Sequence, residues 1–113
     1  MARNAIPVTI AVGATVSSVA NGKGGTLVGV YIPANFSGTT LKFSAYPSTN
    51  QPGAPTGPSP ISDGAGGDYT KTVRAGDYLD LSADLVTNGV DQISFTSGTT
   101  QATTTATLLA VFR

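Results

Sequence analysis

Aspartate is the residue type in this chain that most readily suggests chemistry, because all six acidic residues are Asp. Asp63 and Asp68 flank a glycine-rich stretch, and with Asp77 or Asp80 they could offer oxygen ligands to a calcium ion. The spacing does not match an EF-hand loop, which ends in a Glu that this chain lacks. We therefore expect a solvated turn at this stretch and no metal site.

Enzyme chemistry of the familiar kinds is excluded by composition. The chain has no His and no Cys, which removes the usual zinc ligands, the Ser-His-Asp triad, the Cys nucleophile, haem ligation and disulfides. Two Asp carboxylates in a cleft would be enough for glycoside hydrolysis, but no pair among the six stands out by its position. We predict that the protein is not an enzyme and uses no cofactor.

Charged residues are few and balanced, with six Lys and Arg against six Asp and a net charge of zero. No basic stripe is present to bind nucleic acid, and no run approaches the roughly 20 apolar residues of a membrane-spanning helix. The stretch at residues 21–26, NGKGGT, lacks the spacer of a phosphate-binding loop and leads into a predicted strand rather than a helix. We expect a hairpin turn there, and neither nucleic acid nor membrane as a partner.

The four tyrosines are the remaining candidates for ligand contact. Tyr31, Tyr46, Tyr69 and Tyr78 could form an aromatic platform for sugars. Tyrosines in predicted strands more often lie at the edge of the core or anchor an interface, because the ring is apolar and the hydroxyl needs water or another hydrogen-bond partner. We prefer that interpretation and keep the platform as the alternative.

The segments that contain these residues are predicted to be strands, since β-branched and aromatic residues cluster in short runs between turn residues. At the N-terminus, a signal peptide is disfavoured because Pro7 and Thr9 interrupt the apolar stretch after Arg3. We find no convincing helix and expect a short turn at residues 82–91. The predicted strands are residues 6–12, 26–32, 40–46, 69–74, 78–81, 92–97 and 103–112.

Alternation predicts which side chains face the core. Leu41 and Phe43, and likewise Ile93 and Phe95, are expected to point inward. Residues 26–32 are apolar on both faces, which predicts a central strand with Val28, Val30 and Ile32 on one side and Leu27, Gly29 and Tyr31 on the other. In the last strand, Leu108, Leu109, Val111 and Phe112 predict burial on both faces, and the preceding threonines suit an exposed strand face.

Short strands without crossover helices predict an all-β, antiparallel β-sandwich or jelly-roll-like fold in a single domain of residues 1–113. With so few charges to guard the sheet edges, we expect the edges to be covered by self-association. Five of the seven prolines fall within residues 47–60. This Pro-rich stretch is expected to form a surface loop or a contact arm rather than a central strand.

One segment resembles a known family. Residues 26–48, TLVGVYIPANFSGTTLKFSAYPS, combine a strand, a stop at Pro33, a turn plugged by Phe36 and a second strand. They resemble small virion proteins of tailed phages and prophages, and residues 75–81 and 93–99 and the terminal strand ending in Arg113 are similar as well. Where that family tends to a short polar turn, this chain carries the Pro-rich stretch.

The resemblance implies a capsid decoration, or cement, protein on the surface of the virion. Such proteins are often trimers, so the resemblance implies a homotrimer whose partner is the major capsid protein. The expected contact elements are the N-terminal segment and the Pro-rich arm, and the expected contact residues are Arg3, Ile6, Pro52, Pro55 and Pro58. The alternative is a tail or head-fibre component that binds a host surface glycan through the tyrosines.

Overall fold

Most strands form where the β-branched and aromatic runs predict them, whereas the two-residue strands Ala20–Asn21 and Ser59–Pro60 were not predicted. The computed structural model describes residues 4–22, 25–46, 58–81 and 92–113. Within these residues the regular secondary structure is entirely β, without a helix. The strands are β1 (Asn4–Ile10), β2 (Ala20–Asn21), β3 (Leu27–Tyr31), β4 (Thr40–Ala45), β5 (Ser59–Pro60), β6 (Thr70–Thr72), β7 (Tyr78–Asp80), β8 (Gln92–Ser97) and β9 (Ala106–Phe112).

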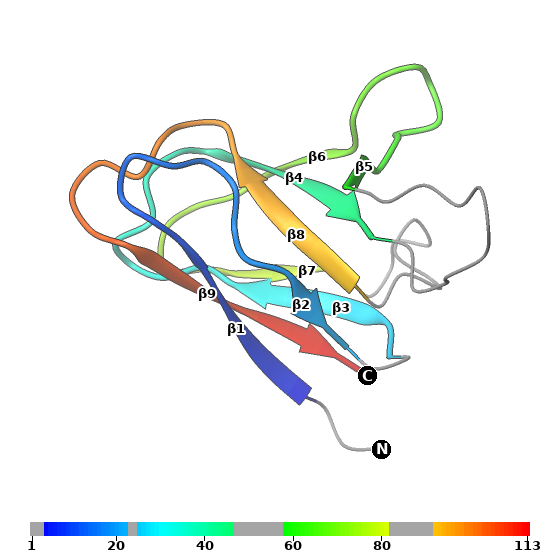
Figure 1. Cartoon of the computed structure of the whole chain (residues 1–113), viewed down its shortest axis with the longest axis horizontal. Helices are drawn as coiled ribbons and strands as arrows, with labels where there is room; N and C mark the ends of the chain where they lie inside the picture. The colour runs from blue at the N-terminus through cyan, green and yellow to red at the C-terminus, as the bar shows by residue number, and fades with distance from the viewer. Residues whose placement is uncertain (1–3, 23–24, 47–57, 82–91) are drawn as a thin grey trace.

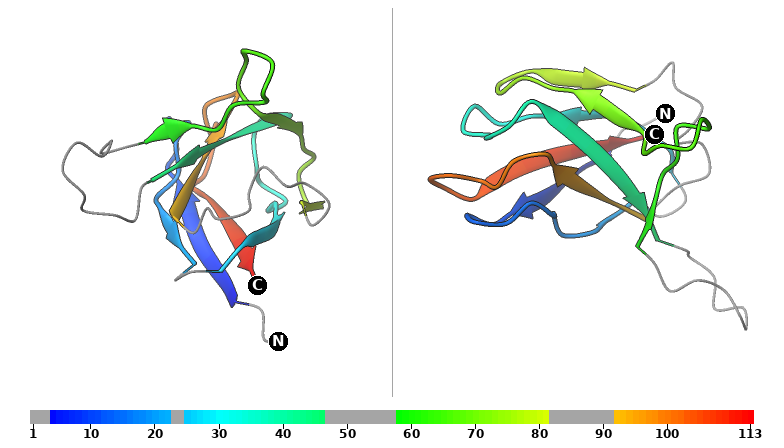
Figure 2. Two further views of the ribbon diagram at one scale, coloured as in Figure 1. Left: turned by 90° about the vertical axis from the view of Figure 1, so that its right-hand side faces the viewer. Right: turned by 90° about the horizontal axis from the view of Figure 1, so that it is seen from above.

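The strands pair antiparallel into two sheets. The first sheet has the order β1-β9-β3-β7 and is called the β9 sheet here. The second has the order β2-β8-β4-β5, with β6 also paired to β4, and is called the β8 sheet. Figures 1 and 2 show the sheets as two layers packed on each other. This arrangement confirms the predicted antiparallel β-sandwich.

The core lies between the two layers and is made by the residues that alternation predicts. Leu41, Phe43, Ile93 and Phe95 are each at most 1% exposed. The rings of Phe43 and Phe95 meet edge to face, with their centroids 5.5 Å apart, a favoured aromatic geometry. Phe36 is also buried in the core cluster, which confirms its role as a plug behind the turn that follows β3.

The central position of β3 is confirmed, because it pairs with β9 on one side and with β7 on the other. The predicted division of its faces is wrong at the start of the strand. The register with β9 shifts between Leu27 and Gly29, and such a bulge inserts a residue and resets the alternation. Leu27 therefore joins Val30 in the core cluster, although simple alternation would place them on opposite faces.

Most connections between consecutive strands cross from one sheet to the other, and two of them bear on predicted turns. The hairpin turn predicted at residues 21–26 is wrong, because β2 pairs with β8 whereas β3 belongs to the β9 sheet. The turn at Gly76 likewise joins β6 in one sheet to β7 in the other, so it is a corner. Gly76 has φ 86°, a left-handed conformation that glycine adopts without a steric penalty.

The end strands differ from the prediction in their bounds. β1 ends at Ile10, and Val12 is 53% exposed beyond it. β9 begins at Ala106, so the threonines at 103–105 lie in an exposed loop rather than a strand. Asn35 holds that loop through a hydrogen bond from its side-chain amide to Thr104 Oγ1 (2.6 Å). The predicted turn at 82–91 and residues 47–57 of the Pro-rich stretch lie outside the described residues.

Candidate interaction surfaces

The edge of the β9 sheet at β1 offers little backbone to another strand. The Thr9 N–H donates to Ser18 Oγ (3.2 Å), and the Ser18 N–H donates to the Thr9 carbonyl (3.0 Å). Backbone groups that point the same way recur every second residue, so Pro7 faces the same edge and has no N–H to donate. A strand added at β1 would therefore gain few hydrogen bonds.

The edge at β6 is protected by charge. Lys71 pairs with Leu41 of β4 and shares its face of the sheet, which is the core side. Its Nζ lies 5.6 Å from the centre of the Tyr69 ring. A strand added at β6 would bury this ammonium group, which is costly, and inward-facing charges on edge strands are a known protection against pairing. The edges at β1 and β6 are therefore poor templates for pairing with another strand.

An apolar row crosses the outer face of the β9 sheet. Strand register places Pro7 directly opposite Leu109. Tyr31 lies opposite Leu109 on one side and opposite Tyr78 on the other. Each of the four strands thus contributes one side chain to a single line, and we call these four residues the apolar row.

The apolar row is accessible to a partner. Tyr31 is 51% exposed, Tyr78 38% and Leu109 37%, so the predicted burial of Leu109 is wrong. The outer face of an antiparallel sheet is usually polar, and contiguous exposed apolar side chains mark interaction sites. The row next to it contains Ala5, Val111, Gly29 and Asp80, with Asp80 as its charged member at the β7 side.

The two tyrosines of the row form one packed unit. Their rings are tilted at 48° with centroids 4.6 Å apart. The Tyr78 ring also lies over Gly29, where a Cβ atom would collide with its hydroxyl and Cζ. The missing side chain of Gly29 therefore creates the space in which Tyr78 lies against the sheet.

The other two tyrosines lie on the β8 sheet. The Tyr69 ring packs on Phe43 with centroids 5.5 Å apart. The Ser94 hydroxyl donates to the Tyr46 hydroxyl (3.4 Å), and Ser94 is completely buried. The four tyrosines are therefore divided between the two layers and do not build one platform.

The glycine-rich turn is organised around Asp63. Asp63 Oδ1 accepts hydrogen bonds from the N–H groups of Ala65 (2.7 Å) and Gly67 (3.1 Å). These bonds stabilise the charged carboxylate and lower the pKa of Asp63. Asp68 instead pairs with Lys42, at 3.4 Å between Oδ2 and Nζ. Within the described residues, no three acidic side chains come together as metal ligands.

The structure describes only two of the five residues predicted as partner contacts, Ile6 and Pro58. Arg3, Pro52 and Pro55 lie outside the described residues. Pro58 is exposed, just before β5. Ile6 is partly buried and packs against the core cluster, which leaves its neighbour Pro7 on the outer face.

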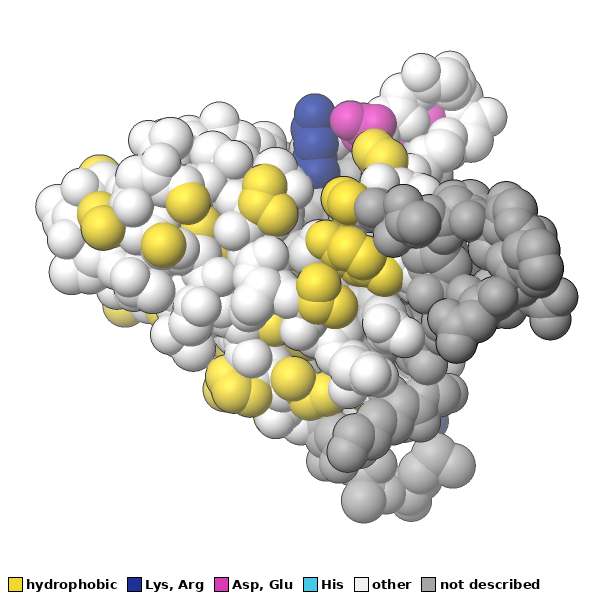
Figure 3. All heavy atoms as spheres, viewed as in Figure 1, with side chains coloured by type: hydrophobic (Ala, Val, Ile, Leu, Met, Phe, Trp, Pro, Cys, Tyr) yellow, Lys and Arg dark blue, Asp and Glu magenta, His cyan; other side chains and the backbone are white. Residues whose placement is uncertain are grey.

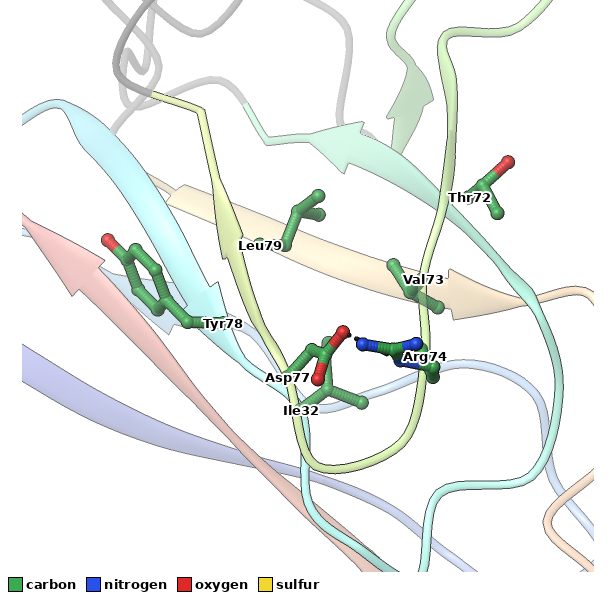
Figure 4. Close-up of a pocket in the computed structure, with 7 residues that line it drawn as sticks. All are labelled: Ile32, Thr72, Val73, Arg74, Asp77, Tyr78 and Leu79. Atoms are coloured by element: carbon green, nitrogen blue, oxygen red, sulfur yellow. Dashed lines mark hydrogen bonds and ion pairs between the residues drawn. The ribbon is translucent and has the colours of Figure 1, made fainter.

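A small recess lies between β6 and β7 at the corner (Figure 4). Its volume is about 80 Å³. In Figure 4 the Arg74 and Asp77 side chains meet at its mouth, and Arg74 Nε lies 2.9 Å from Asp77 Oδ2. The recess is too small for an organic ligand of ordinary size, and the guanidinium is already paired.

The apolar row was not predicted, although each of its residues belongs to a predicted strand or its flank. Figure 3 shows few charged side chains on the face of the molecule seen there. No helix in the described part of the chain is long and apolar enough to cross a membrane. The chain matches no protein-family model, no curated protein and no solved structure.

Proposed function

We propose that this protein is a capsid decoration protein of a tailed phage, which binds the outer surface of the major capsid protein and stabilises the shell. The observation that carries the proposal is the apolar row, because exposed aromatic and aliphatic side chains in one line are suited to adhesion to another protein. The similarity of residues 26–48 to small virion proteins supports the same role.

The row favours a protein partner over a small ligand. It is a line of side chains across four strands rather than a concavity, and specific protein interfaces are built on aromatic anchors such as Tyr31 and Tyr78. Burying these rings and Leu109 would contribute through apolar area rather than through charge. Attachment should therefore resist moderate salt.

We propose a homotrimer as the attached form. A trimer would place three apolar rows on neighbouring capsid subunits, and linked weak contacts reinforce one another. Bridging of subunits by one trimer would stabilise the shell. Because the edges at β1 and β6 are protected, the contact between protomers would not use strand pairing at these two edges.

The experiment is quantitative mass spectrometry of purified virions with heads separated from tails. Hundreds of copies travelling with heads would agree with decoration. A few copies travelling with tails would contradict it and favour the fibre component that binds a host glycan. That alternative has less support, because the tyrosines do not converge on one platform.

A variant tests the surface itself. Leu109→Asp places a charge in the apolar row and should abolish attachment to capsids that lack the protein, while the fold is retained. Thr100→Asp, in an exposed loop before β9, is the matched control and should attach normally. Equal attachment of both variants would contradict the assignment of the row.

A further inference from the structure

The outer face of the β8 sheet carries a groove of a different character from the apolar row. It has a volume of about 250 Å³ and lies over β4, β5 and β8. Thr96 lies directly opposite Lys42, and Pro60 lies directly opposite Ser44. Four of the six residues that line the groove are polar (Lys42, Ser44, Asp68 and Thr96), and Phe43 and Pro60 add apolar surface.

Two hydroxyl groups in the groove are available to a ligand. Ser44 and Thr96 are partly exposed, and within the described residues neither side chain makes a hydrogen bond. Each hydroxyl can donate one hydrogen bond and accept others. They come from adjacent strands and face the same side of the sheet, so one ligand can reach both.

The charges in the groove compensate each other. Lys42 and Asp68 form an ion pair at 3.4 Å, and both side chains are 48% exposed. The pair provides donors and acceptors without a net charge, so it gives an anionic ligand little advantage over a neutral one. Pro60 adds an exposed apolar surface beside these polar groups.

We propose that this groove binds one neutral pyranose unit of a saccharide. A pyranose presents several hydroxyls that match Ser44, Thr96 and the ion pair, and its C–H face can pack on Pro60. The volume, below the roughly 300 Å³ at which drug-sized ligands begin, agrees with a single sugar ring. This inference is independent of the proposed function, because the groove and the apolar row lie on opposite layers.

The test is a titration of the ¹⁵N-labelled protein, followed by NMR, with the methyl glycosides of glucose, galactose, mannose and N-acetylglucosamine. We expect one of them to shift the amide signals of Ser44 and Thr96, with a dissociation constant on the order of 1 to 10 mM. Thr96→Val and Ser44→Ala should each weaken binding about five- to tenfold, the effect of one hydrogen bond. Thr107→Val, on the outer face of the β9 sheet, is the matched control and should bind like the unaltered protein.

Four results would overturn the proposal. The first is the absence of amide shifts with all four glycosides, each added at 50-fold the upper limit of the expected dissociation constant or at its solubility limit. The second is unchanged affinity in both hydroxyl variants, Thr96→Val and Ser44→Ala. The third is equal shifts with glycerol, which would show a preference for any polyol. Tighter binding of N-acetylneuraminic acid than of every neutral glycoside would overturn the assignment to a neutral sugar.

Discussion

Replacing Gln101 should destabilise this protein more than its position in a threonine-rich loop would indicate. Gln101 is only 1% exposed. Its Oε1 accepts a hydrogen bond from the Ser37 N–H (2.9 Å), and its Nε2 donates to the Ser37 carbonyl (3.0 Å). The side-chain amide thus satisfies both backbone groups of Ser37, as a neighbouring strand would, and ties the turn after β3 to the loop before β9.

The magnitude follows from these two bonds. Gln101→Leu keeps most of the side-chain volume, so the cavity contribution is small. It removes two hydrogen bonds with a net value of about 1 kcal/mol each. It also leaves the Ser37 N–H without a partner, which adds desolvation cost, whereas the Ser37 carbonyl keeps the hydrogen bond from Ser97 Oγ (3.1 Å). We expect a loss of about 3 kcal/mol in the free energy of unfolding, or roughly 12 °C in the melting temperature for a chain of this length.

The assay is urea unfolding followed by circular dichroism, with Thr100→Val as the matched control in the same loop. The control should stay within about 0.5 kcal/mol of the unaltered protein, as exposed substitutions usually do. Gln101→Glu adds a pH test, because an ionised carboxylate accepts from the Ser37 N–H but cannot donate to the Ser37 carbonyl. Burial would raise the pKa of the introduced carboxyl, so this variant should gain stability as the pH falls and the group becomes protonated.

The reasoning would be refuted if Gln101→Leu unfolded at the same urea concentration as the control. The same conclusion would follow if Gln101→Glu showed the pH dependence of the unaltered protein. Either result would mean that water replaces the amide at Ser37 without cost.

Further predictions concern the apolar row, the glycine-rich turn and the protected edges. Gly29→Ala should displace the Tyr78 ring and cost about 1 to 3 kcal/mol of stability, and an unchanged melting temperature would contradict the packing argument. Hydrogen bonds lower the pKa of Asp63 in the folded state, so its contribution to stability is present above the unfolded pKa of about 3.9 and is lost as the pH falls through the folded pKa. Asp63→Asn should therefore flatten the acid side of the stability profile measured by urea unfolding, and an identical profile would argue against this role. The double variant Pro7→Thr with Lys71→Thr should associate through its edges, which size-exclusion chromatography with light scattering would detect as added mass, whereas a change confined to Thr100 should not.

Much of the fold follows from local pattern. In residues 40–46 and 92–97, hydrophobic alternation predicts the inward positions of Leu41, Phe43, Ile93 and Phe95, because a strand exposes opposite faces at successive residues. Pro33 and Phe36 likewise predict where β3 ends and how the following turn is plugged. These properties depend on residues that are close together in the chain, so the sequence alone is enough to predict them.

The errors arise where distant segments decide the outcome. The register shift that turns Leu27 into the core is set by pairing with β9, and residues 21–26 look like a hairpin turn until the partners of β2 and β3 are known. The threonines at 103–105 have strand propensity but no partner strand within the described structure. Propensity is a weak guide where pairing and burial determine strand formation.

The sequence by itself determined the β class, the core-facing residues of the regular strands and the absence of His and Cys chemistry. The tertiary structure decided the surfaces, because Pro7, Leu109, Tyr31 and Tyr78 lie far apart in the chain and become neighbours only through cross-strand register. It likewise turned Lys71 toward the core side of an edge strand and brought Ser44 beside Thr96 in one groove. A local pattern specifies which face a residue occupies, whereas the identity of its neighbours depends on how the sheets pair.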